Sequence, residues 1–167
     1  TAAMVPRSTL VARNGFINGH GTTMSLLYDL KTRHYGKSNF LCSSERFFDQ
    51  PIAATCSAAL IAPNLILTAG HCIGTEGTCR TASFIFGFSM NSENEPQTTF
   101  KAEDIVHCKK IVAKSVNNQG IDFSVVEIDR EITHLKPLIL SNNSRLQVGT
   151  PLVAIGQPSG LPTKASI

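Results

Sequence analysis

The chain has 167 residues, a length that fits one domain. Hydrophobic residues make up 42% of it and charged residues 16%, a low charged fraction that suits a secreted β protein. The net charge of +3 is too small to indicate nucleic acid or an anionic membrane as a partner. Pro63 and Asn64 interrupt the most apolar stretch, so no run reaches the roughly 18 residues of a membrane-spanning helix.

The predicted strands are short and numerous, and turn residues separate them. Phe84, Phe86 and Phe88 alternate with other residues, the period-two pattern of a strand with one buried face. These signals predict an antiparallel sandwich or barrel. Residues 1–49 are predicted to be an N-terminal extension with irregular structure or a short helical turn near residues 46–48. The predicted strands lie at residues 58–61, 65–67, 81–88, 98–107, 110–113, 122–128 and 150–155, with a loop at residues 74–77.

Five cysteines indicate an oxidising compartment if they pair. Cys79 and Cys108 are a candidate pair, whose disulfide would close a loop of about 30 residues and contribute about 3 kcal/mol by restricting the unfolded chain. The alternative use is zinc, since His71, Cys72 and Cys79 lie close together in the sequence. No Cys-x-x-Cys spacing accompanies them, so we expect no metal site.

An apolar run at residues 65–67 leads into Thr68-Ala69-Gly70-His71-Cys72. Small residues before a histidine leave room beside its imidazole where a buried strand ends. The stretch resembles the histidine motif of trypsin-like (chymotrypsin-fold) serine proteases, in the glycine-bearing form of V8-like, or glutamyl-endopeptidase-like, bacterial members. Taken alone, the motif could instead be a core histidine beside a structural disulfide.

Two further segments extend the resemblance in the family's chain order. Asp122-Phe123-Ser124-Val125 heads an apolar strand and resembles the family's aspartate motif. Residues 156–162, Gly-Gln-Pro-Ser-Gly-Leu-Pro, are similar to the segment that precedes the nucleophile in V8-like members. The resemblance implies that His71 is the general base and that Asp122 orients it. Without the histidine motif, Asp122 would be interpreted as an acid that caps a strand.

The resemblance also implies an all-β fold, with a six-stranded antiparallel Greek-key barrel in residues 50–130. Residues 131–167 would then hold the connection between two barrels and the first strand of the second. A disulfide between Cys56 and Cys72 is implied as well, which leaves Cys42 without a partner in the chain. No cofactor or metal is implied, and we expect a secreted or periplasmic protein.

The family's nucleophile loop, Gly-Asp-Ser-Gly-Gly-Pro or Gly-Asn-Ser-Gly-Ser-Pro, does not occur in residues 1–167. Ser159 does not replace it, because the preceding Pro158 has no N–H for an oxyanion and the glycine spacing is wrong.

We therefore expect these residues to be the N-terminal portion of a serine endopeptidase that cleaves proteins or peptides. A C-terminal chain of the same precursor would carry the serine, with Cys42 as the candidate link. The alternative is a non-catalytic homologue that binds another protein, although a binding module has no physical need for His71 together with Asp122.

Overall fold

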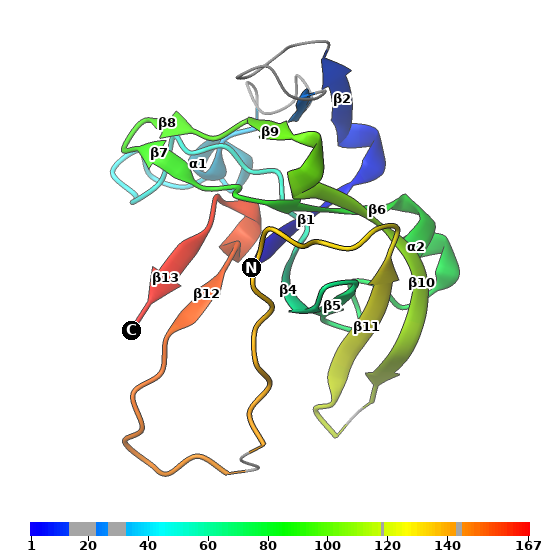
Figure 1. Ribbon diagram of the computed structural model, residues 1–167. Helices are drawn as coiled ribbons and strands as arrows, with labels where there is room; N and C mark the ends of the chain where they lie inside the picture. Colours follow the sequence, from blue (N-terminus) through cyan, green and yellow to red (C-terminus); the bar gives the residue numbers. More distant parts are fainter. Residues whose placement is uncertain (14–22, 27–32, 118, 143–144) are drawn as a thin grey trace.

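Most of the regular structure is β-strand in the computed structural model, which describes residues 1–13, 23–26, 33–117, 119–142 and 145–167 (Figure 1). Helices are short and lie outside the sheets. In chain order the elements are β1 (Ala2–Pro6), η1 (Arg7–Thr9), β2 (Leu10–Arg13), β3 (Thr23–Leu26), α1 (Tyr35–Ser38), β4 (Cys56–Ala62), β5 (Leu65–Thr68), α2 (Glu76–Thr81), β6 (Ala82–Phe86), β7 (Met90–Ser92), β8 (Glu95–Pro96), β9 (Thr99–Lys101), η3 (Ala102–Asp104), β10 (Ile105–Val116), β11 (Asp122–Ile128), β12 (Ala154–Gly156), η4 (Pro158–Gly160) and β13 (Lys164–Ser166).

Six strands close into an antiparallel barrel in the order β1-β4-β5-β11-β10-β6. The β4–β5 hairpin turns at Pro63 and Asn64, and β5 pairs with β11 so that Ser124 lies opposite Thr68. Closure leaves the barrel without an exposed edge. The barrel confirms the fold class predicted from the sequence.

The barrel's first strand lies outside the predicted range of residues 50–130, which is therefore wrong at its N-terminal side. β1 pairs with β4 through Ala2 and Ala58, and with β6 through Ala2 and Phe86. Ala2, Ala3 and Val5 are fully buried. A five-residue strand with two alanines and a terminal proline has too little β propensity to be recognised from sequence, so its burial between two neighbours decides its conformation.

The apolar core has two parts, and β6 contributes to both. Phe84 and Phe86 pack inside the barrel with Ile66 and Val126. Ile85 points the other way, into a second cluster that includes Phe88 and Phe100 from the chain after β6 and from β9. The sequence predicted one buried face for this strand, whereas the structure buries both. Phe100 of β9 and Leu10 of β2 belong to this cluster, so the small sheet β2-β3-β9 covers the second face.

After β11 the chain runs along the barrel as far as Leu138, whose N–H bonds to the carbonyl oxygen of Leu60 at 2.8 Å, and then leaves it (Figure 1). Ile132 is buried and its N–H bonds to the carbonyl oxygen of Pro63, 2.7 Å away. Farther along, Leu152, Val153 and Ile155 are 61%, 57% and 52% exposed. The predicted strand at residues 150–155 is placed too early, because the strand here is β12, which pairs with β13 in a two-stranded sheet.

Candidate functional site

His71 lies in a tight turn directly after β5. The N–H groups of Cys72 and Ile73 both point at the carbonyl oxygen of Ala69, at 3.1 and 3.4 Å, which closes one helical turn around the histidine. Ile73, two residues after His71, is fully buried in the barrel core and fixes the end of the turn. The side chain of His71 is 68% exposed, so its ring is presented to solvent rather than packed in the core.

Gly70 has to be glycine because two strands pass close to it. A Cβ atom there would lie 2.8 Å from the backbone oxygens of Ser115 and Phe123. Those atoms belong to the paired ends of β10 and β11, where Ser115 lies opposite Phe123. The missing side chain therefore lets the histidine turn rest directly on the strand that begins at Asp122.

Asp122 holds His71 through two hydrogen bonds. Its Oδ1 accepts the backbone N–H of His71 at 2.9 Å, and its Oδ2 lies 2.5 Å from the ring Nδ1. The residues are 51 positions apart in sequence, and the β5–β11 register brings them together. One contact fixes the backbone and the other fixes the ring, so the carboxylate sets the position of the imidazole as well as its orientation.

The same contacts hold the pKa of the Asp122 carboxyl below its ordinary value. The hydrogen bond with the His71 side chain is the largest cause, followed by the one from the His71 backbone, while partial burial opposes them. An ionised carboxylate can only accept, so we assign the shared proton to Nδ1 of the imidazole. The other ring nitrogen, Nε2, is then free to accept a proton from a hydroxyl group.

A disulfide joins Cys56 on β4 to Cys72, the residue after His71. It is the pairing that the resemblance implied. Nitrogen and sulfur atoms of Cys56, His71 and Cys72 lie within 4.8 Å of one another, which is the spacing of a metal cluster. Both sulfurs are consumed by the disulfide, however, and zinc needs thiolates. Among the described residues, the Cys56–Cys72 disulfide therefore supports the position of His71, and this group is not a metal site.

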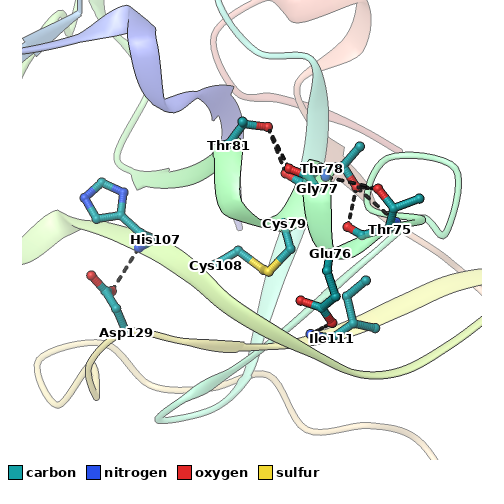
Figure 2. Close-up of a disulfide and its surroundings, with 10 residues drawn as sticks. All are labelled: Thr75, Glu76, Gly77, Thr78, Cys79, Thr81, His107, Cys108, Ile111 and Asp129. Carbon is teal, nitrogen blue, oxygen red and sulfur yellow. Dashed lines mark hydrogen bonds between the residues drawn. A yellow bond between two sulfur atoms is a disulfide. The ribbon is translucent and has the colours of Figure 1, made fainter.

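The second disulfide, Cys79–Cys108, ties α2 to β10 (Figure 2). The sequence predicted a loop at residues 74–77, but α2 begins at Glu76 with a capping box between Thr75 and Thr78. The Thr-x-x-Thr spacing was the signal for it, although a threonine at the last position is weaker than the usual glutamate. Cys79 is fully buried, so this bridge is part of the barrel wall.

Two contacts that the sequence did not reveal hold α2 and the histidine turn against β10. Glu76 accepts a hydrogen bond from the N–H of Ile111 at 3.2 Å, where the β10–β11 register shifts (Figure 2). Lys114, farther along β10, donates to the carbonyl oxygen of Gly74. A bulge leaves an unpaired N–H, which a carboxylate from a neighbouring helix can satisfy. The segment after His71 is therefore fixed on both sides.

The remaining sequence-predicted residues lie apart from this group. Ser159 lies in η4 with a left-handed φ of 52°, and no hydrogen bond joins it to His71 among the described residues. Cys42 is a free, exposed thiol, as expected. Beside Asp122 lies a shallow depression of about 350 Å³, lined by small side chains of β4 and β5 and by Ile155 of β12. It offers open space next to the carboxylate, between the barrel and β12.

Comparison with known protein families matches residues 37–166 to the family described as Trypsin. The chain belongs to the trypsin family. None of the curated proteins matches it. Family membership identifies the chain as a serine protease or a homologue of one, and the barrel with its His71–Asp122 pair agrees with that.

The two disulfides indicate an oxidising, extracytoplasmic environment. Within the ranges that the structure describes, no helix has the length and apolar character needed to cross a bilayer.

Proposed function

We propose that residues 1–167 are the histidine- and aspartate-bearing part of a serine endopeptidase of the V8-like type. One observation carries the proposal: the carboxylate of Asp122 holds both the backbone and Nδ1 of His71. Acyl transfer requires an imidazole in that tautomer to take the proton of a serine hydroxyl, and a carboxylate to stabilise the imidazolium that forms. The similarity of residues 156–162 to the segment before the nucleophile supports the V8-like assignment.

In this proposal the serine comes from polypeptide outside residues 1–167, in a C-terminal chain of the same precursor. Two features support a companion polypeptide. The apolar side chains of Leu152, Val153 and Ile155 are exposed around a two-stranded sheet, and such a sheet gains stability from further strands. Cys42 is exposed and free to form a disulfide with that chain. The proposed substrate is a protein or peptide, and the proposed location is secreted or periplasmic.

The test is covalent labelling of the native, full-length protein with a fluorophosphonate probe, which reacts only with an activated serine. We expect labelling of one serine outside residues 1–167, and loss of labelling in His71→Ala. His134→Ala is the matched control, because His134 pairs with Asp104 and not with Asp122.

The competing function is a non-catalytic homologue that binds another protein. It would be established if the folded, full-length protein failed to label while a known serine protease labelled under the same conditions. Labelling that persisted in His71→Ala would show an activated serine that does not depend on this histidine, and would overturn the assignment of the general base.

A further inference from the structure

Two cationic side chains share one aromatic ring on the part of the molecule formed by residues 42–50 and β13. The guanidinium carbon of Arg46 lies 4.7 Å from the centre of the Phe47 ring, and Nζ of Lys164 lies 4.8 Å from it. Both distances are within the range of a cation–π contact. We call Arg46, Phe47 and Lys164 the cationic clamp.

The structure describes no anion that pairs with the clamp. Among the residues that the structure describes, neither Arg46 nor Lys164 forms an ion pair with a carboxylate. Burial lowers the pKa of the Lys164 ammonium group, and repulsion from Arg46 lowers it further. Two like charges at one half-buried ring repel each other, and a bound anion would remove that cost.

The backbone holds both halves of the clamp in fixed positions. Phe47 has a left-handed φ of 68°, a conformation that a bulky residue adopts only when its surroundings impose it. The next residue is held in place, because the ring of Phe48 packs so closely on Gly36 that a Cβ atom there would lie 1.9 Å away. The N–H of Gly36 also bonds to the carbonyl oxygen of Phe48 at 2.8 Å.

The chain that carries Lys164 is hydrogen-bonded to the chain just after the Phe47 segment. The N–H groups of Ala53 and Ala54 both bond to the carbonyl oxygen of Gly160, at 2.9 and 3.2 Å. Lys164 follows four residues later on β13, and its Nζ donates to the carbonyl oxygen of Pro162 at 3.0 Å. The clamp is therefore pre-organised, which lowers the entropic cost of binding a ligand.

We propose that the cationic clamp binds a side-chain carboxylate in an acidic peptide segment of a partner protein. Arg46 supplies the fork of donors that matches a carboxylate, and Lys164 supplies a second, localised charge. The ring edge of Phe47 contacts the aliphatic stem of the bound glutamate or aspartate.

The experiment measures fluorescence anisotropy of a fluorescein-labelled tetraglutamate peptide with the native, full-length protein at low ionic strength, where such contacts are strongest. We expect binding of this peptide, no binding of the tetraglutamine peptide, and a loss of affinity of about tenfold or more in the double variant Arg46→Met with Lys164→Met. Lys164→Arg keeps the charge and should retain affinity within about threefold.

Matched controls are Lys37→Met and Arg80→Met, two exposed cations outside the clamp, which should change the affinity less than twofold. An unchanged affinity in the double variant would overturn the proposal. So would an equal loss in the controls, which would show general attraction to a positively charged protein. A further outcome is that a heparin oligosaccharide binds more tightly than the peptide and loses binding in the double variant. That result would overturn the proposal, because it would show that the ligand of the clamp is a polyanion and not a peptide carboxylate.

Discussion

A Cβ atom on Gly70 would lie 2.5 Å from Cγ2 of Val116. The two residues come from the histidine turn and the last position of β10, and Val116 lies opposite Asp122 in the β10–β11 pairing. The space that Gly70 leaves empty therefore determines how closely His71 approaches its carboxylate.

Gly70→Ala should destabilise the fold by about 1–3 kcal/mol, because the added methyl group meets backbone oxygens that cannot move independently. It should also move His71 away from Asp122 and reduce peptidase activity of the full-length protein. Denaturant unfolding and kcat/KM measure the two effects. Gly77→Ala is the control, since the nearest atom to a Cβ there is 3.5 Å away and alanine favours the helix. Equal stability of the two variants would contradict this account of Gly70.

Asp122→Asn should leave the fold nearly unchanged and reduce kcat by roughly 10⁴-fold, the loss that follows when the imidazole of a triad takes the wrong tautomer. The amide oxygen can still accept the backbone N–H of His71, which preserves the turn. The measurement is kcat of the full-length protein beside its thermal unfolding. A loss of stability in proportion to the loss of activity would show that Asp122 acts through the fold instead.

His107 should make the barrel less stable in acid. Its Nδ1 lies 2.7 Å from Oγ of fully buried Ser83, and burial is the main cause that lowers its pKa below 6.5. Arg7 and Arg130 lower the pKa further, while Asp129 raises it. The unfolded chain therefore takes up the proton first, and the free energy of unfolding falls as the pH drops below about 6.5.

Denaturant unfolding between pH 8 and pH 5 measures this effect. His107→Gln should flatten the dependence on pH. Identical slopes for the protein and for His107→Gln would rule His107 out as the responsible group.

The two disulfides should differ in what their loss affects. Replacing both Cys79 and Cys108 by alanine removes a bridge across 29 positions, and should cost about 3 kcal/mol with little direct effect on the histidine. Replacing Cys56 and Cys72 by alanine removes the bridge beside His71 and should lower kcat/KM at temperatures where the protein remains folded. Unfolding curves and kcat/KM, measured together, separate these outcomes; an equal effect on activity would contradict the distinction.

Residues 1–167 expressed alone should not hydrolyse peptides. They contain the proposed base and its carboxylate but no glycine-flanked serine, so the nucleophile and its oxyanion donors are missing together. The measurement compares this polypeptide with the native protein on a mixed peptide library. Turnover by the 167-residue chain, abolished by His71→Ala, would show that these residues contain a nucleophile of their own.

The sequence predicted the features that depend on local spacing. The small residues before His71 indicated a strand that ends there, and the apolar run after Asp122 indicated a strand that begins there. The pairing of the two residues needed the family resemblance, because nothing local relates positions 51 residues apart. The β5–β11 register supplies the physical reason.

Features fixed by tertiary contacts were not predicted. α2 was missed because Gly74 and Gly77 indicate a loop, whereas the Cys79–Cys108 bridge and the Glu76–Ile111 hydrogen bond hold it as a helix. The cationic clamp was missed because Arg46 and Lys164 are far apart in sequence. Both cases depend on contacts between distant segments, which periodicity does not record.

β1 also constrains how the protein is made. Its partners are β4 and β6, so Ala2 has to wait until Phe86 has left the ribosome before it can pair on both sides. At 5–20 residues per second, that delay is roughly 4–17 s. During it the edge of β1 that later pairs with β6 is open and can pair with another nascent chain. Correct assembly therefore depends on keeping this edge of β1 unengaged, and a chaperone that holds β1 would protect the barrel before it closes.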